Sequence, residues 1–340
     1  MKIWKRFSAL ALTLALALSL TACGGEKAPD GESSADLEEI TFVLDWTPNT
    51  NHTGLYVALE KGYFKDAGLK VTVVQPPEDG AEMLVASGRA QFGVSFQDYV
   101  GAALSGDTAL DVTAVAAILQ HNTCGIVSRK GEGLDNPKGL EGHKYATWNR
   151  EVEQATLRQV VETAGGDFSK VELIPSTVTD EVSALQSKSV DAIWIFYGWA
   201  GIACELAGLE TDFFAFKDVD PVFDLYTPVV IGNNGFLEEH PDTAKAFLAA
   251  LSKGYQDAIA NPEEAAQILM EASPELKDSA DLILASQQYL AEQYQADAAR
   301  WGEFDPARWG GFFTWLNDHE LVQNPLDPAA GFTNDFLPEA

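Results

Sequence analysis

The hydrophobic positions between Ile40 and about Val127 form short runs rich in β-branched side chains, separated by stretches with helical spacing. The runs are ITFVLD, LKVTVVQ, AQFGVSF and DVTAVAAIL. Strands that alternate with helices are typical of βαβ units, in which successive strands run parallel. The pattern therefore predicts an α/β lobe with a mainly parallel sheet flanked by helices.

A second alternation of the same kind occupies residues 140–216. Its strand-like runs are HKYATW, KVELIP and VDAIWIF, and the helical stretch EVEQATLRQVVETAGG lies between the first two. Gly165 near the end of that stretch suits a helix C-cap, because glycine adopts the left-handed conformation at low cost. We predict a second α/β lobe here.

Beyond Gly235 the pattern becomes helical. In NPEEAAQILMEA, Asn261 is expected to act as the N-cap, with Pro262 in the first turn. In DPARWGGFFTWL, Asp305 begins a helix in the same way, and the following apolar residues recur at i, i+3, i+4 and i+7. We interpret that stripe as packing rather than as a ligand site.

Two extended stretches, CGIVSRK at 124–130 and LYTPVVIGNN at 225–234, are placed to carry the chain between the lobes. The resulting prediction assigns 40–127 and 229–340 to lobe 1 and 128–228 to lobe 2. Two crossings make a hinge that can close on a ligand. Two rigidly fused lobes are the alternative.

The first 22 residues read as an export signal, since cationic residues precede an apolar run that ends in LTAC. The run has fewer than the roughly 18 residues of a membrane-spanning helix. LTAC resembles the lipobox of bacterial lipoproteins, so we expect lipidation at Cys23; a plain secreted protein is the alternative. Residues 23–39 are rich in Gly, Ser and acidic side chains, and predict a flexible tether.

The formal charge is −29 for the whole chain and becomes −32 when the three cations of the signal are removed. Nucleic acid and anionic lipid surfaces are therefore excluded as partners. Cys124 and Cys204 remain in an exported domain. Their spacing does not decide whether they pair, and their apolar surroundings favour two buried free thiols.

Four strand ends share a composition in which aromatic rings accompany amides, hydroxyls or carboxylates. They are LDWTPNTNH, SFQDY, ATWNRE and WIFYGW. Ligands of open parallel sheets bind beyond the carboxyl ends of the strands, so this composition predicts a small-molecule cleft. Aromatic faces can sandwich a flat ring, which fits a nitrogen-rich heterocycle better than a sugar phosphate or a metal.

Asp45 is the candidate anchor, because a carboxylate accepts hydrogen bonds from an exocyclic amino group and a ring N–H. It could instead cap the helix near residue 52, although Thr50 and Asn51 lie closer to that role. His52 is either a ligand-binding residue or a surface or capping residue.

After the strand VDAIWIF, Tyr197 and Trp199 lie beyond the strand end and are candidates for the ligand, whereas Trp194 lies within the strand and is expected in the core. Glu205 is either part of the site or on a solvated helix face. From SFQDY we add Phe96 and Gln97 as candidates.

Catalytic motifs are not found. GVSFQ lacks the second glycine of a nucleophile elbow, and the histidines show neither H-E-x-x-H nor an i, i+4 pair. We therefore predict no catalytic residue, no metal and no cofactor, and we predict that the protein is not an enzyme.

The segments DWTPNTNHTGLYVALEKGYFKDAGLKV, QHNTCGIVSRK, YGWAGIACE and FTNDFLP resemble the thiamine-pyrimidine-precursor binding proteins of bacterial ABC importers. The resemblance covers about residues 40–338. That family has the type II periplasmic-binding fold and is related to fungal pyrimidine-synthesising enzymes. DWTPNTNHTG is specific to the family, whereas GYFKDAGLKV occurs in wider relatives that carry nitrate and sulfonates.

The resemblance implies that Asp45 and Trp46 line the pyrimidine pocket, with Asn49 and His52 close by. It also implies an opposite wall, formed by three residues of YGWAGIACE: Tyr197, Trp199 and Glu205. Some relatives carry an acidic residue at the position of Ala200, so the resemblance implies that this chain lacks a charged contact to the ring substituent and leaves the exact ligand open.

The expected protein is thus a monomeric lipoprotein on the outer face of the cell membrane, attached only by its lipid. It would bind a formyl-aminomethyl or hydroxymethyl aminopyrimidine between its lobes and deliver it to an ABC permease and its ATPase. Riboflavin or another small solute is the alternative ligand. Less favoured alternatives are a pyrimidine-synthesising enzyme and a purely structural surface lipoprotein.

Overall fold

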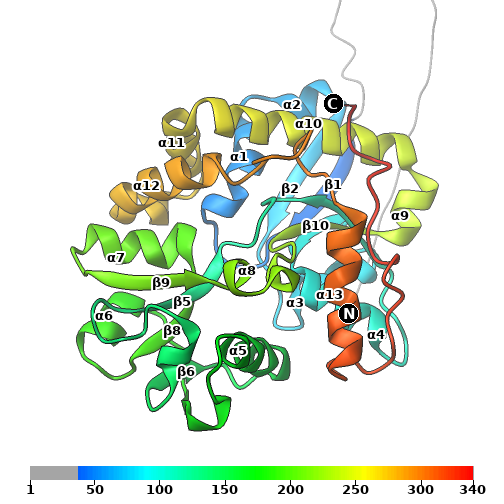
Figure 1. Ribbon diagram of the computed structural model, residues 1–340. Coiled ribbons are helices and arrows are strands. Elements are labelled where there is room, and N and C mark those ends of the chain that lie inside the picture. Colours follow the sequence, from blue (N-terminus) through cyan, green and yellow to red (C-terminus); the bar gives the residue numbers. More distant parts are fainter. Residues whose placement is uncertain (1–36, 340) are drawn as a thin grey trace, which may run out of the picture. The chain divides into compact units, whose positions relative to one another are not determined.

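The computed structural model describes residues 37–339 (Figure 1). The expected signal peptide, the lipidation site Cys23 and most of the tether lie outside the described residues. The first strand begins at Glu38, inside the stretch assigned to the tether. The described residues belong to one compact unit.

The first sheet has the strand order β2-β1-β3-β10-β4. Four of its strands run parallel to one another, and β10 is antiparallel to both of its neighbours. Its core face is aromatic: Phe92 stacks on Phe247 with ring centroids 4.2 Å apart. The strands are β1 (Glu38–Val43), β2 (Leu69–Val74), β3 (Phe92–Ser95), β4 (Val112–Ala117) and β10 (Val229–Asn233).

The second sheet repeats this design with the order β7-β6-β8-β5-β9, and β5 is its antiparallel strand. The strands are β5 (Cys124–Arg129), β6 (Lys144–Thr147), β7 (Glu172–Pro175), β8 (Ala192–Phe196) and β9 (Thr211–Ala215). The prediction of two mainly parallel sheets in an α/β fold is therefore confirmed.

The strand β5 pairs with the second sheet over its whole length, so residues 124–127 lie in that sheet although we assigned them to lobe 1. Likewise β10 returns the chain to the first sheet. The other residue boundaries of the two lobes stay a prediction.

Helices flank both sheets, and Figure 1 shows α1, α2 and α10 gathered beside β1 and β2. The α-helices are α1 (Thr53–Glu60), α2 (Tyr63–Asp66), α3 (Gly80–Ala86), α4 (Gln97–Ser105), α5 (Glu151–Thr163), α6 (Glu181–Gln186), α7 (Ile202–Leu206), α8 (Phe216–Val219), α9 (Asn234–Glu239), α10 (Pro241–Ala260), α11 (Pro262–Ala272), α12 (Ala280–Ala291) and α13 (Pro306–Asp318). Short 3₁₀ turns are η1 (Thr50–His52), η2 (Pro137–Leu140), η3 (Phe168–Lys170), η5 (Pro221–Phe223) and η6 (Pro274–Ser279), and η4 (Tyr197–Gly201) is a π-helical turn.

The observed helix ends can be compared with the capping residues that the sequence predicted. Asp305 caps α13 as expected, because its carboxylate accepts from the backbone N–H of Arg308 at 2.8 Å. Asn261 is the N-cap residue of α11 and Pro262 lies in the first turn, as expected, although the Asn261 side chain makes no capping hydrogen bond. Gly165 follows the C-cap of α5 with a φ of +74°, as the pattern predicted.

The apolar stripe of α13 is packing, as predicted. All four of its residues are buried: Trp309, Phe312, Phe313 and Leu316. No helix among residues 37–339 combines the length and the apolar character that crossing a membrane requires.

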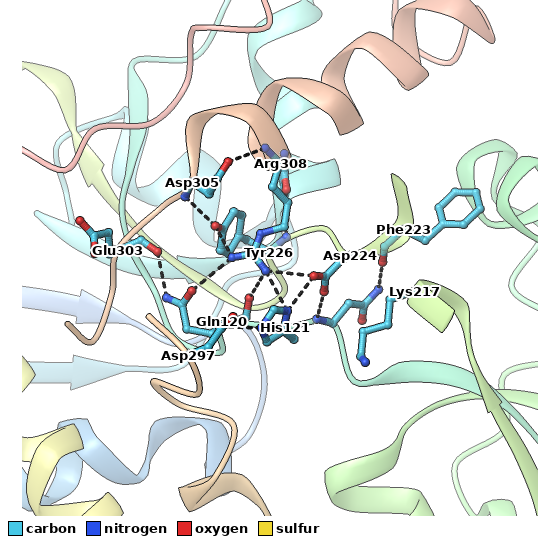
Figure 2. A network of polar contacts seen from close by, with 12 residues as sticks. Gln120, His121, Lys217, Phe223, Asp224, Tyr226, Asp297, Glu303, Asp305 and Arg308 are labelled. Carbon is cyan, nitrogen blue, oxygen red and sulfur yellow. Dashed lines mark hydrogen bonds and ion pairs between the residues drawn. The ribbon is translucent and has the colours of Figure 1, made fainter. Parts of the chain in front are cut away.

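The chain passes between the sheets at residues 118–123 and 224–228. The first crossing precedes the predicted stretch 124–130, and the second overlaps the first part of the predicted stretch 225–234. Figure 2 shows that one polar network joins both segments. His121 Nδ1 lies 2.7 Å from Asp224 Oδ2, which also lies 3.0 Å from Arg308 Nη1. The network therefore ties the two crossings to each other and to the start of α13.

Cys124 and Cys204 are free and buried, as the sequence favoured. Burial raises the pKa of the Cys124 thiol far above its usual range and that of Cys204 to about 11. A raised thiol pKa leaves little thiolate, the reactive form, at neutral pH. We expect neither thiol to react with a disulfide reagent at pH 7.5 in the folded protein, and both to react in guanidinium chloride. Fast labelling of either residue in the native state would contradict this expectation.

Candidate functional site

Large exposed side chains follow several strand ends, where the sequence predicted a binding cleft. Trp46 follows β1 and is 69% exposed; Tyr99, in the first turn of α4 after β3, is 39% exposed; Trp148 follows β6 and is 40% exposed. Bulky apolar side chains are usually covered, so rings left open at strand ends of the two sheets mark a surface suited to a flat ligand.

Asp45 and His52 form a hydrogen-bonded pair beneath this surface. His52 is buried, and its Nε2 lies 2.6 Å from Asp45 Oδ1. The backbone N–H of Asn49 donates to His52 Nδ1 at 3.2 Å, so that nitrogen carries no proton. The imidazole proton therefore sits on Nε2 and is donated to Asp45. This bond occupies one carboxylate oxygen and leaves the other for a ligand.

His52 consequently cannot be a ligand residue, because both of its ring nitrogens have partners and its side chain is covered. It is instead the residue that orients Asp45. Asn49 is the N-cap of η1, and its side chain accepts from the backbone N–H of Asn51 at 2.9 Å. The helix-capping role that we considered for Asp45 is thus performed by Asn49.

The two candidates from SFQDY differ in their surroundings. Gln97 is buried, its Nε2 donates to the carbonyl of Trp309 at 2.9 Å and its Oε1 accepts from the N–H of Tyr226 at 2.9 Å. Both polar atoms of its amide therefore bond to the fold. Phe96 is half-buried and faces Phe196 of the second sheet, with ring centroids 6.3 Å apart. Phe96 therefore lies where the two sheets face each other.

Tyr197 and Glu205 contact each other, because the tyrosine hydroxyl donates to the exposed carboxylate. Burial, followed by that carboxylate, raises the pKa of Tyr197. Its ring packs between Phe213 and Tyr289, with centroids 4.7 and 5.4 Å away. Only part of Tyr197 is thus open to a ligand.

Trp199 belongs to a small hydrophobic cluster with residues of α11 and α12. Figure 1 shows α12 beside α7, and α7 begins three residues after Trp199. The ring of Trp199 therefore helps to join the second sheet's helices to the C-terminal helices. Trp194, which we expected in the core, is partly buried and packs on Phe216 with centroids 4.2 Å apart.

Tyr99 has one cationic and three anionic groups in its surroundings. Burial is the main cause that raises the pKa of its hydroxyl, and the carboxylates of Asp98, Glu82 and Asp45 raise it further. The guanidinium of Arg150, which has the largest effect among the charged groups, lowers this pKa. Such surroundings favour a ligand that donates hydrogen bonds, as amino groups and ring N–H groups do.

Four residues at this surface were missed when candidates were chosen from the sequence: Asp98, Tyr99, Trp148 and Arg150. They lie in SFQDY and ATWNRE, which we had recognised as unusual strand ends. Composition singled out these segments, but nothing in the sequence showed which side chains face the other sheet.

Two surface hollows of about 320 and 370 Å³ lie elsewhere, near the C-terminal segment and between α7 and α12. Neither is lined by a candidate residue. At the strand ends the two sheets approach each other at Phe96 and Phe196. Among residues 37–339, no group of His, Cys, Asp and Glu is arranged to hold a metal ion.

Comparisons with solved structures identify the fold. The periplasmic aliphatic sulphonate binding protein of Escherichia coli superposes with a TM-score of 0.65 at 16% identity, covering 86% of this chain and 96% of that chain. A Candida albicans protein described as having the generic periplasmic binding protein fold superposes with a TM-score of 0.58 at 13% identity, covering 89% and 98%. The chain has that fold.

Sequence comparisons find more similar relatives. A formylaminopyrimidine-binding protein of Halalkalibacterium halodurans is 29% identical over 97% of this chain and 99% of its own length. A riboflavin-binding protein of Chloroflexus aurantiacus is 23% identical over 97% of both chains. A yeast 4-amino-5-hydroxymethyl-2-methylpyrimidine phosphate synthase is 25% identical over 71% of this chain and 73% of its own.

The family model described as NMT1/THI5 like matches residues 49–265, which is more than half of the sequence. The match begins at Asn49, four residues after Asp45, and includes the strand ends that carry Tyr99, Trp148 and Tyr197. The chain therefore belongs to the NMT1/THI5-like family.

Proposed function

We propose that the protein captures an aminopyrimidine precursor of thiamine and delivers it to an ABC importer. The observation that carries this proposal is the Asp45 carboxylate, oriented by a buried histidine at 2.6 Å and flanked by the exposed Trp46. The full-length similarity to a formylaminopyrimidine-binding protein supports the choice of ligand.

The free oxygen of Asp45 would accept from the exocyclic amino group of the pyrimidine, while Trp46 stacks on the ring. From the second sheet, Trp148 offers an exposed ring, whereas the Tyr197 hydroxyl is occupied by Glu205. We therefore propose Trp148, with the open part of Tyr197, as the opposite wall. Recognition needs no bond making, and we propose a binding protein rather than an enzyme.

The proposed setting follows from the N-terminal sequence. Residues 1–22 would direct export, Cys23 would carry the lipid, and the acidic tether would hold the monomer at the outer face of the membrane. Its partners would be a permease and an ATPase of the ABC class. Metabolic labelling with a fatty acid, compared between the wild-type protein and Cys23→Ser, tests the anchor directly.

Thermal unfolding of residues 24–340 against a panel of ligands tests the function. The panel contains thiamine, its formyl-aminomethyl and hydroxymethyl pyrimidine precursors, riboflavin, nitrate and taurine. A specific ligand at about 100 times its Kd stabilises the native state by about 2.7 kcal/mol. We expect stabilisation by one aminopyrimidine, and stabilisation by none of the panel would refute the proposal.

Riboflavin is the second candidate ligand, favoured by the similarity to a riboflavin-binding protein along the whole chain. Its isoalloxazine ring is also flat and rich in nitrogen, so exposed Trp46 and Trp148 would suit it. Stabilisation by riboflavin alone would retain the binding function and change the ligand.

Trp46→Ala separates binding from stability. Because Trp46 is 69% exposed, its removal should change the free energy of unfolding without ligand by less than about 0.5 kcal/mol. Loss of ring stacking should weaken ligand binding about tenfold, which calorimetric titration would measure. Leu206→Ala, at a 52% exposed position on α7, is the matched control and should leave affinity unchanged. Equal affinities of wild type and Trp46→Ala would remove Trp46 from the site.

A further inference from the structure

One ion pair joins the two sheets at the candidate site. Arg150 lies between β6 and α5 of the second sheet, and Asp98 lies in the first turn of α4 beside the first sheet. Arg150 Nη2 lies 3.2 Å from Asp98 Oδ2. The guanidinium also lies over the ring of Tyr99, 4.4 Å from its centroid. One side chain of the second sheet thus makes two polar contacts with the first.

The segment that carries Arg150 is held by a buried carboxylate, Glu153. This carboxylate accepts hydrogen bonds from the Tyr145 hydroxyl at 2.7 Å, the Thr147 hydroxyl at 3.1 Å, and the backbone N–H groups of Trp148 and Arg150 at 3.1 and 3.2 Å. Four donors on one carboxylate fix the course of the chain from β6 into α5. Arg150 is therefore presented to the first sheet from a rigid support.

Asp98 has little access to water while the sheets are together: 15% of its side chain is exposed, against 38% for Arg150. Burial raises the pKa of Asp98, and the Arg150 guanidinium opposes that rise. A covered carboxylate needs a charged partner, and a guanidinium satisfies it with directed N–H donors. Separation of the sheets would break this pair and the contact with Tyr99 together.

We propose that Arg150 is a latch between the two lobes, which holds them closed through Asp98 and Tyr99 and thereby slows the escape of a bound solute. The latch borders the candidate ligand surface, because Arg150 lies over the exposed Tyr99, and the Tyr99 ring is next to Phe96, which meets Phe196 of the second sheet. Closure by the latch does not require a ligand, whereas its effect on solute release rests on the proposed function.

The experiment compares wild type, Arg150→Met, Asp98→Asn and the double variant, each comprising residues 24–340. Small-angle scattering of the ligand-free proteins reports lobe opening, and stopped-flow fluorescence reports ligand dissociation. We expect both single variants to have a larger radius of gyration than the wild type. The double variant should open no further than Arg150→Met, because both changes break the same contact.

Arg158→Met is the matched control. Arg158 lies on α5, pairs with Glu162 at 3.8 Å and lies over the Phe168 ring at 4.4 Å, so its contacts resemble those of Arg150 but stay within the second sheet's helices. This control should scatter like the wild type. The Arg150 and Asp98 variants should release the pyrimidine about five- to tenfold faster with little change in association rate.

Identical scattering of wild type and Arg150→Met would overturn the latch, even if a pyrimidine binds. Additive opening in the double variant would also overturn it, because the two residues would then act separately. If no panel compound binds but Arg150→Met still opens the lobes, the proposed function fails and the latch stands.

Discussion

Replacing Asp45 with Asn is expected to weaken aminopyrimidine binding by about 3 kcal/mol, roughly 150-fold in Kd. The Asn side-chain oxygen can still accept from His52 Nε2, which lies 2.6 Å from the corresponding carboxylate oxygen. The amide then presents N–H groups to the ligand where an acceptor is needed. Two donors face each other, and the charge that strengthens the bond is lost.

Calorimetric titration of the variant measures this loss, and urea denaturation shows whether it remains folded. Glu39→Gln is the matched control, since Glu39 lies on the same strand and its carboxylate is exposed and paired with Lys70. The control should bind as the wild type does. A folded Asp45→Asn protein with wild-type affinity would place the ligand elsewhere.

The α/β architecture could be predicted because the spacing of hydrophobic residues within each segment distinguishes a strand from a helix. The runs containing β1, β3 and β6 were identified from β-branched and aromatic residues between helical stretches, and the structure pairs them as parallel strands. The antiparallel strands β5 and β10 were recognised as extended, but their sheet membership depends on pairing between distant segments. Sequence pattern carries no direct signal for that pairing.

The candidate site was predictable at the level of segments and less so for individual side chains. Asp45 and Trp46 follow strand β1 closely, as the pattern predicted, and their contact with a ligand stays a prediction. Gln97 looks like an anchor in sequence, yet its amide bonds Trp309 and Tyr226, which are more than 100 residues away. Side chains of the same type can bind a ligand or the fold, and only tertiary contacts separate the two roles.

His52 also shows that the role of a side chain cannot be assigned from the sequence alone. Its position near Asp45 suggested a shared site, and the two residues do touch. The backbone of Asn49, however, occupies the second ring nitrogen and burial covers the ring, so the histidine supports the site without lining it. The backbone turn that brings these atoms together begins at Asn49, the N-cap of η1. From the sequence we had placed this cap at Thr50 or Asn51.

Gly254→Ala is expected to destabilise the fold by about 3 kcal/mol and to weaken ligand binding as well. Helices α1 and α10 cross closely at this point: a Cβ on Gly254 would lie 2.0 Å from the carbonyl oxygen of Gly54 and 2.8 Å from Ala58 Cβ. Alanine is the better helix former by roughly 1 kcal/mol, but overlap with backbone atoms outweighs that gain. The helices must move apart.

That displacement reaches the ligand site because α1 follows η1 directly. The carbonyl of Asn51 accepts from the Tyr255 hydroxyl at 2.7 Å, so α10 also positions the turn that contains His52. Gly311→Ala in α13 is the control, since a Cβ at this position would meet nothing within 4 Å. This substitution should stabilise the protein by about 0.5–1 kcal/mol. Urea denaturation compares the two variants, and equal stabilities would show that the α1–α10 crossing tolerates a methyl group. A loss of affinity in Gly254→Ala alone would show that the aminopyrimidine site depends on this helix crossing.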